Sequence, residues 1–226
     1  MPVGVARPLP LRRPAGSDLA TALGLREPTG IFAAVRTVPV GLAGASALCA
    51  LSGPVLIARG VVMRTVTIGR REATLLHGPG DILAPVDAEP SPFRARSRAL
   101  AEASVAVLSQ DVMRQAAKVP EVAARIAAGV HAQADELSVQ ALLTQLPSVT
   151  ARLEVLLPRL AERHGTVCAD GVLLPAFLSH TVLAALVGVR RPSFTTALGE
   201  LTRATTLLRL DDGRWMVGAE LAGLAA

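Results

Sequence analysis

The sequence has few of the residues that build metal centres and cross-links. Its two cysteines, Cys49 and Cys168, lie far apart and have no C-x-x-C partner. This excludes a zinc knuckle or an iron–sulfur cluster within one chain, and we interpret both cysteines as buried apolar residues or free thiols. The histidines show no ligand spacing either: His77, His131, His164 and His180. We therefore expect no metal site and no cofactor.

Lysine is almost absent, because Lys118 is the only one and arginine supplies nearly all the positive charge. The formal net charge is +5, but the region from Pro147 onward has eight arginines against seven acidic residues and nets only +1. Composition alone therefore does not indicate nucleic-acid binding. Positive surface in that region must be local, and we expect it around Arg190, Arg191 and Arg203.

One uncharged segment, Thr37–Ala58, is long enough to span a bilayer. Two prolines, two serines and three glycines interrupt it, so we interpret its second half as short strands separated by turns. The N-terminus is rich in proline and arginine through Arg13 and does not resemble a secretory signal. We expect a cytoplasmic protein with no membrane partner.

The hydrophobic content of 51% is ample for a core in one large or two modest domains. Residues 1–30 are rich in proline, glycine and arginine, and we expect them to be loosely ordered. Within residues 31–108, short β-rich runs alternate with glycine or charged turns, which predicts a small barrel or roll. The runs are residues 54–60, 61–68, 73–76 and 104–108, with a Gly78-Pro79-Gly80-Asp81 turn before the last.

A helical region is expected over residues 109–146. Its residues at alternating steps of four and three predict a coiled-coil seam and a homodimer through residues 119–144. The seam consists of Val119, Ala123, Ile126, Val130, Gln133 and Leu137, with Gln133 as a register-setting position. The alternative is an ordinary helix packed on its own roll, because the seam covers fewer than four heptads. Pro147 ends the pattern, and a further helix is expected over Val149–His164.

Residues 147–226 contain two short helical patterns that meet at Gly188. Ser179 is a good N-cap for the first, and Pro192 falls in the first turn of the second. Gly188 supplies the turn, and together with Ala184 we expect it to allow close helix packing. The expected facing residues are Leu183, Ala184 and Val187 in the first helix and Phe194, Leu198 and Leu201 in the second.

An Asp212-Gly213 pair between Leu207–Leu210 and Arg214–Val217 predicts a hairpin that would serve as a wing. Two helices, an Arg-Arg start to the second and a wing occur in the order that a winged helix-turn-helix requires. The alternative is a small helical core with a trailing hairpin.

The second helix supplies the predicted DNA contacts. Guanidinium groups and free amides at a helix N-terminus suit phosphate, and an arginine there can also read a guanine edge in the major groove. We assign base contacts to Arg191, Thr195 and Thr196. Contacts to the DNA backbone are assigned to Ser179, Arg190 and Ser193, and Arg203 adds to the positive footprint.

The order of roll, long helix and winged helix-turn-helix resembles the Crp/Fnr family of bacterial transcription regulators over roughly residues 31–218. The most similar stretches are A-R-L-E-V-L-L-P-R-L-A-E-R-H-G-T-V, G-P-G-D-I-L, A-L-A-E-A-S-V-A-V-L and L-S-H-T-V-L-A-A-L-V-G-V-R-R-P-S, the last looking like the actinobacterial branch. The resemblance implies an α+β fold: an N-terminal cyclic-nucleotide-binding-like β-roll, a dimerisation helix and a C-terminal winged helix-turn-helix. It also implies palindromic double-stranded DNA, RNA polymerase and a small-molecule effector as candidate partners.

The ligand cassette departs from the family pattern. In members that bind cyclic nucleotides, a Gly-Glu pair holds the ribose and an Arg-Ser or Arg-Thr pair holds the phosphate. Here no Gly-Glu follows Gly80-Asp81, and Phe93 holds the position of the arginine, so that Arg94 would need a shifted register to replace it. We expect no tight cAMP binding. The candidate effector residues are Gly80, Asp81, Arg94, Arg96 and Arg98, unless the three arginines form a solvated basic strand face.

The recognition helix also departs from the pattern of the well-known members, which read bases with an arginine, a glutamate and a second arginine. Arg191, Pro192 and Thr196 hold these places, so the familiar half-site is not expected. We expect a homodimeric transcription regulator. The alternative is a dimeric small-molecule sensor whose helix-turn-helix has lost DNA binding. An enzyme is not expected, because these motifs assemble no nucleophile, base and orienting group.

Overall fold

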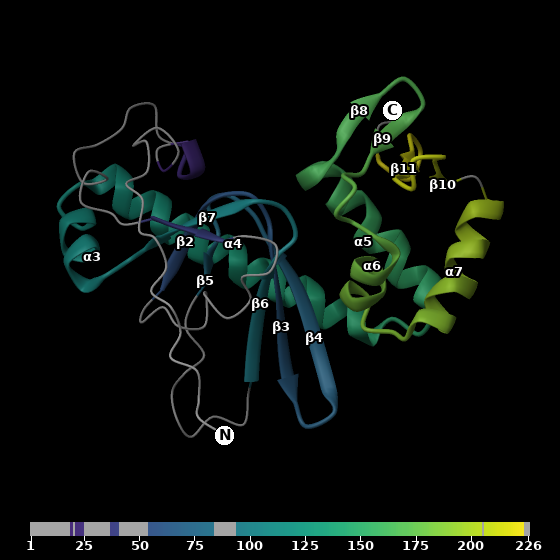
Figure 1. Ribbon diagram of the computed structural model, residues 1–226, viewed down its shortest axis with the longest axis horizontal. Helices are drawn as coiled ribbons and strands as arrows, with labels where there is room; N and C mark the ends of the chain where they lie inside the picture. The colour runs from purple at the N-terminus through teal and green to yellow at the C-terminus, as the bar shows by residue number, and fades with distance from the viewer. Residues whose placement is uncertain are drawn as a thin grey trace. The chain divides into compact units, whose positions relative to one another are not determined.

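The computed structural model describes residues 19, 21–24, 37–40, 54–83, 94–204 and 206–223. The chain divides into two compact units, Met1–Glu136 and Leu137–Ala226. Figure 1 shows strands and the start of the long helix in the first unit and mostly helices with a small sheet in the second. The predictions for Cys49 and Phe93, and almost all of the segment 1–30, fall outside the described residues.

Antiparallel strands build the first unit. One sheet has the order β1-β7-β2-β5 and the other the order β4-β3-β6. Their bounds are β1 Thr37–Val40, β2 Val55–Arg59, β3 Val62–Ile68, β4 Arg71–His77, β5 Ile82–Leu83, β6 Arg94–Ala99 and β7 Ala103–Val107. Each of the four predicted β-rich runs therefore overlaps one strand, namely β2, β3, β4 and β7 in chain order. The two antiparallel sheets agree with the β-roll that the family resemblance implies.

The segment Thr37–Ala58 contributes β1 at its start and most of β2 at its end. Its short strands join the same sheet through β7, which lies between β1 and β2. Among the described residues, no helix has both the length and the hydropathy needed to cross a membrane.

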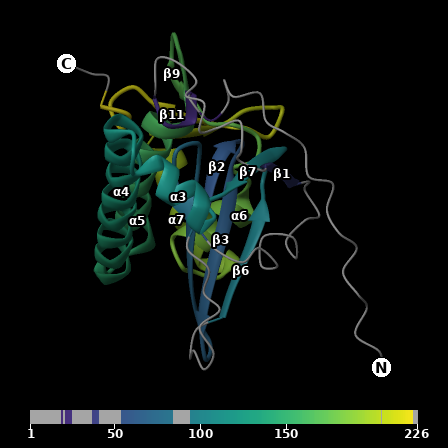
Figure 2. The same ribbon diagram turned by 90° about the vertical axis from the view of Figure 1, so that its left-hand side faces the viewer.

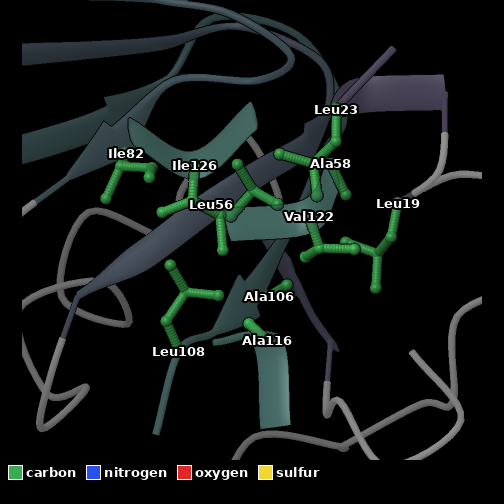
Figure 3. Packing of buried hydrophobic residues seen from close by; sticks show 10 residues of the cluster. All are labelled: Leu19, Leu23, Leu56, Ala58, Ile82, Ala106, Leu108, Ala116, Val122 and Ile126. Carbon is green, nitrogen blue, oxygen red and sulfur yellow. The ribbon is translucent and has the colours of Figure 1, made fainter. Parts of the chain in front are cut away.

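Two helices complete the core of the first unit. Helix α3 (Gln110–Ala116) begins at Ser109, whose hydroxyl accepts a hydrogen bond from the Val112 N–H at 3.3 Å. Helix α4 (Pro120–Gln145) follows, and Figure 2 shows it as one uninterrupted helix. Figure 3 shows buried side chains from the helices and the sheet meeting in one cluster, which includes Leu56, Ala58, Ile82, Ala106, Leu108, Ala116, Val122 and Ile126.

This packing divides the predicted coiled-coil seam. Ile126 is buried in the cluster and Val119 packs against it, so these two residues face the chain's own roll and not a partner. Burying an aliphatic side chain of this size stabilises the fold by about 1.5–3 kcal/mol. Val130 and Leu137, by contrast, are half exposed, at 51% and 50%. The prediction of a dimer seam is therefore wrong for its first half, where the helix packs on its own roll instead.

The second unit begins within α4 and continues with α5 (Val149–His164), which Ser148 caps through a 3.0 Å hydrogen bond from the Ala151 N–H. A four-stranded antiparallel sheet of order β10-β11-β9-β8 follows its helices. The remaining bounds are β8 Thr166–Cys168, β9 Gly171–Leu173, α6 His180–Leu186, α7 Arg191–Arg203, β10 Leu207–Arg209 and β11 Trp215–Gly218. The predicted helix over Val149–His164 is thus confirmed residue for residue.

Candidate nucleic-acid interface

Helices α6 and α7 form the predicted helix-turn-helix. Ser179 caps α6 through a 3.4 Å hydrogen bond that its hydroxyl accepts from the Val182 N–H. The predicted facing residues are all buried: Leu183, Ala184, Val187, Phe194, Leu198 and Leu201. Apolar residues on one face of each helix therefore fix how α7 packs on α6.

Gly188 follows the end of α6 in the turn between the helices and has φ of +70°, a left-handed conformation that favours glycine. A Cβ added to Gly188 would meet no atom within 4 Å. The expectation that a side chain here would push the helices apart is therefore wrong. Gly188 is required by its backbone conformation and not by the space around it.

The start of α7 presents exposed cations. Arg190 is the N-cap residue and makes no side-chain cap bond, and Arg191 and Pro192 begin the helix. Pro192 is tolerated here because amides in the first turn have no intrahelical acceptor. Ser193 follows and is exposed as well. Helix amides, the positive end of the helix dipole and two guanidinium groups thus coincide, which suits phosphate binding.

Thr195 and Thr196 lie on the exposed side of α7, as predicted. Each hydroxyl donates to the carbonyl four residues earlier, Thr195 to Arg191 at 2.9 Å and Thr196 to Pro192 at 3.3 Å. The Thr195 hydroxyl also lies 3.3 Å from Nε2 of His180, the first residue of α6. A side chain of α6 therefore touches a predicted base-contacting residue of α7.

His180 and Arg209 join this site, although neither was predicted as a site residue. The pKa of His180 is lowered from its usual 6.5, first by burial and then by the positive charges of Arg191 and Arg209. Arg209 is exposed on β10, with its guanidinium carbon 5.4 Å from the centre of the Trp215 ring. The observed hairpin register pairs Arg209 with Trp215, whereas a two-residue turn at Asp212-Gly213 would have placed Arg209 opposite Met216, so the sequence did not indicate this contact.

The wing is present as β10 and β11, which pair antiparallel with Gly213 in the turn at φ of +82°. The Asp212 carboxylate accepts hydrogen bonds from the guanidinium and from the backbone N–H of Arg214, and both lower the pKa of Asp212. This bonding occupies the Arg214 side chain within the wing. Arg209, the other arginine of the hairpin, is the one whose charge acts on His180 of α6.

A second hairpin, β8–β9, extends the wing sheet and was not predicted. It carries the same signal as the wing, an Asp170-Gly171 pair, and Gly171 adopts φ of +146°. A Cβ on Gly171 would lie 2.2 Å from the Val217 carbonyl oxygen, so β9 and β11 require glycine at this contact. Cys168 on β8 is an exposed free thiol, which leaves the buried interpretation wrong for this cysteine.

Arg203 does not share one cluster with Arg190 and Arg191. It lies in the last turn of α7, and a rise of 1.5 Å per residue places it roughly 18 Å along the helix axis from Arg191. The expected positive footprint is therefore divided between the two ends of the recognition helix.

Two polar side chains, from α4 and α5, donate hydrogen bonds to the turn of the helix-turn-helix. The buried Gln140 of α4 donates its Nε2–H to the Leu186 carbonyl at 2.8 Å. Arg152 of α5 donates to the carbonyls of Thr144 (3.2 Å), Leu146 (3.0 Å) and Val187 (3.1 Å). These carbonyls end α4 and α6, where intrahelical donors are missing. The guanidinium of Arg152 thus joins the end of α4 to the turn that precedes α7.

The candidate effector residues lie on two separate elements, a turn and a strand. Gly80 (φ +92°) and Asp81 form the turn before β5, where the Asp81 carboxylate accepts from the Gly78 N–H at 2.8 Å. On β6, Arg94, Arg96 and Arg98 alternate with less exposed residues and point to solvent, and Arg96 pairs with Glu72 at 3.1 Å. The described residues therefore favour the solvated strand face over a pocket. No three His, Cys, Asp or Glu side chains in these parts of the chain are placed to hold a metal.

No family model and no curated protein sequence matches the chain. Solved structures do match. A double mutant of CooA from Carboxydothermus hydrogenoformans has a TM-score of 0.70 at 16% identity, covering 92% of this chain and 95% of CooA. A cyclic nucleotide-binding domain containing protein from Listeria monocytogenes has 0.66 at 16% identity, with 88% and 97% covered.

A CRP/FNR-family transcriptional regulator from Thermus thermophilus has a TM-score of 0.57 at 21% identity, covering 84% of this chain and 94% of the regulator. These matches extend over both units, so the similarity is not limited to the roll or to the helix-turn-helix. The chain therefore has the fold of the CRP/FNR transcription regulators: a cyclic-nucleotide-binding-like β-roll, a long helix and a winged helix-turn-helix.

Proposed function

We propose that the protein is a homodimeric transcription regulator of the Crp/Fnr type, which reads palindromic double-stranded DNA with α7. The observation that carries this proposal is the exposed face of α7, which follows the turn at Gly188 and has Arg191, Thr195 and Thr196 toward solvent. Arg190, Ser193 and Ser179 are proposed to contact phosphates at its start, and Arg203 at its far end. The L-S-H-T-V-L-A-A-L-V-G-V-R-R-P-S stretch supports the actinobacterial branch, and RNA polymerase is the candidate protein partner in the cytoplasm.

The exposed residues of α4 support a dimer through a seam shifted by one position from the predicted one. Val130 and Leu137 are retained, while exposed alanines replace Ile126 and Gln133. The shifted seam consists of Ala127, Val130, Ala134, Leu137 and Ala141, again at steps of three and four. Small residues at every second position allow two α4 helices to approach closely. Two such subunits would place their recognition helices about 34 Å apart, in successive major grooves.

Control by cAMP is not expected. The alternation along β6 sends Arg94 outward, while Ser97 and Ala99 point into the roll. The three arginines of β6 are therefore exposed, and none of them is buried in the roll. A different effector, or a roll that acts only as scaffold, agrees with this arrangement.

Selection of bound fragments from random duplex DNA tests the proposal, followed by affinity measurements at several salt concentrations with and without cAMP. We expect an enriched palindrome, affinity that falls steeply with salt, and no effect of cAMP. A cAMP-dependent enrichment would show that the roll binds the nucleotide after all. A variant with Arg190 and Arg191 both changed to alanine is the control for binding outside α7.

The rival function is a dimeric small-molecule sensor that no longer binds DNA. Pro192 favours it, because proline offers no side-chain hydrogen bond at a position facing the groove. Complete absence of enrichment, in a dimer that still binds a small molecule, would support the rival.

A further inference from the structure

The Thr195 hydroxyl has two polar neighbours, and together they determine where its single proton lies. The Arg191 carbonyl oxygen is 2.9 Å away and can only accept. His180 Nε2 is 3.3 Å away and can donate or accept, depending on its tautomer. Both contacts are satisfied only if Thr195 donates to Arg191 and His180 donates to Thr195.

The surroundings of the His180 ring support the same assignment. The ring meets the fully buried Phe194 edge to face, with centroids 4.6 Å apart at an angle of 79°. Its other nitrogen, Nδ1, is buried and has no hydrogen-bond partner among the described residues. Neither tautomer gives Nδ1 a partner, so the contact at Nε2 decides the tautomer: only an Nε2–H completes the bond to a hydroxyl whose own proton is donated to the Arg191 carbonyl. The proton therefore belongs on Nε2, directed at Thr195.

The geometry points to a consequence for base recognition: Thr195 reads DNA as a hydrogen-bond acceptor only, and His180 is the positioning residue that keeps it so. The hydroxyl proton is held by the Arg191 carbonyl, and one acceptor site is filled by His180. One acceptor site remains, on the exposed side of α7. In the major groove it can accept from the amino group of adenine or cytosine, whereas guanine and thymine offer acceptors on the same edge.

This inference rests on the proposed function and deepens it, because it names the base class at one position of the half-site. Selection with the wild-type chain first identifies the operator, and the same selection with Thr195→Val identifies the position that Thr195 reads. We expect adenine or cytosine at that position, preferred about tenfold over guanine or thymine. Thr195→Val should abolish this preference, and Thr195→Ser should retain it.

The role of His180 is tested by two variants measured on operators that differ only at this base pair. His180→Phe removes the donor, so the hydroxyl can rotate and donate to the groove. We expect the tenfold preference to fall to about twofold there, with the other base pairs unchanged. His180→Gln, which keeps an N–H near the Nε2 position, should restore most of it. Thr202→Val is the matched control, because its hydroxyl makes the same bond to a carbonyl four residues back at 3.0 Å without a histidine.

The outcomes separate the two ideas. An enriched palindrome with guanine or thymine at the Thr195 position would overturn the inference while the proposed function stands. A uniform loss of preference at all positions in His180→Phe would show that the histidine is merely structural, and would also overturn it. If the wild-type chain enriches no palindrome, the proposed function fails and the inference fails with it.

Discussion

Two glycines in the helix-turn-helix have opposite effects on its stability. Gly188 has φ of +70° and open space around it, so an alanine there meets conformational strain and nothing else. Gly199 lies inside α7, where glycine lowers helix stability and a Cβ would come no closer than 3.9 Å to the Arg203 side chain. The first glycine is needed for the turn, and the second weakens the helix that it interrupts.

We therefore expect Gly188→Ala to lower the free energy of unfolding by about 1 kcal/mol or slightly more, and Gly199→Ala to raise it by about 0.5–1 kcal/mol. Urea denaturation followed by far-ultraviolet circular dichroism measures both. The two variants control for each other, because each adds one methyl group to the same helix-turn-helix. A stabilising Gly188→Ala would contradict the argument from backbone conformation.

His180 makes the stability of the second unit depend on pH. Its folded pKa lies below 6.5, because burial and the charges of Arg191 and Arg209 disfavour the protonated ring. The unfolded chain thus binds a proton as pH falls through 6.5 while the folded chain resists it, and the free energy of unfolding decreases. Denaturation at pH 7.5 and 5.5 should show a smaller decrease for His180→Gln than for the wild type. Equal decreases would assign the pH dependence to other groups.

At the scale of elements, periodicity predicted best where one face of a segment is buried. The helices over residues 149–164, 180–186 and 191–203 each bury an apolar face, and the first has the bounds that the sequence predicts. The wing was found from its Asp-Gly turn. The β8–β9 hairpin was missed although it has the same turn, because all three residues of β8 are exposed and show no alternation of burial.

The candidate site was predicted less completely than the fold, since its contacts join distant segments. The bond between His180 and Thr195 and the approach of Arg209 depend on how α6, α7 and β10 pack, and sequence spacing does not encode this. The seam on α4 failed in its first half for a related reason. Periodicity shows that Ile126 is buried, but not whether the roll or a second subunit buries it.

Arg152 is the residue through which one element positions another. Its guanidinium donates hydrogen bonds to carbonyls at the ends of α4 and α6, and Gln140 donates a buried hydrogen bond to the same turn. Arg152→Met leaves those carbonyls without their donor, and we expect a loss of about 2 kcal/mol in unfolding free energy. Arg152→Lys should recover only part of it, because an ammonium group cannot reach three acceptors in a fork.

A double-mutant cycle with Gln140→Leu measures whether the two side chains act together, and urea denaturation supplies all four stabilities. We expect a coupling of about 0.5 kcal/mol or more, because Leu186 and Val187 are adjacent in the same turn. Additive losses within error would mean that the two contacts are independent.

At the scale of the whole molecule, the exposed row on α4 predicts assembly. Leu137 lies on the shifted seam and is 50% exposed, whereas Leu142 is 61% exposed on the same helix but off the seam. We expect Leu137→Glu to shift the protein from dimer to monomer in sedimentation velocity, because a seam buries each charge beside its copy. Leu142→Glu, which adds the same charge, should remain dimeric. Dissociation by both variants, or by neither, would remove the shifted seam as the interface.

The dimer doubles every phosphate contact, and this makes the salt dependence of DNA binding a measure of which arginines take part. Each phosphate contact contributes about −0.9 to the slope of log K against log salt, so removing one arginine per subunit should reduce the slope by about 2. We expect this for Arg190→Ala, because Arg190 is the N-cap residue of α7. We also expect it for Arg209→Ala, because the charge of Arg209 acts on His180 at the start of α6. Arg191→Ala should instead relax base preference at a cost of about 1–3 kcal/mol.

Arg214→Ala is the matched control for Arg209→Ala in the same hairpin, because Asp212 already holds the Arg214 guanidinium at 2.6 Å. A loss of slope in Arg214→Ala equal to that in Arg209→Ala would show that the wing contributes only its total charge, and that the position of Arg209 toward the recognition helix has no part in binding.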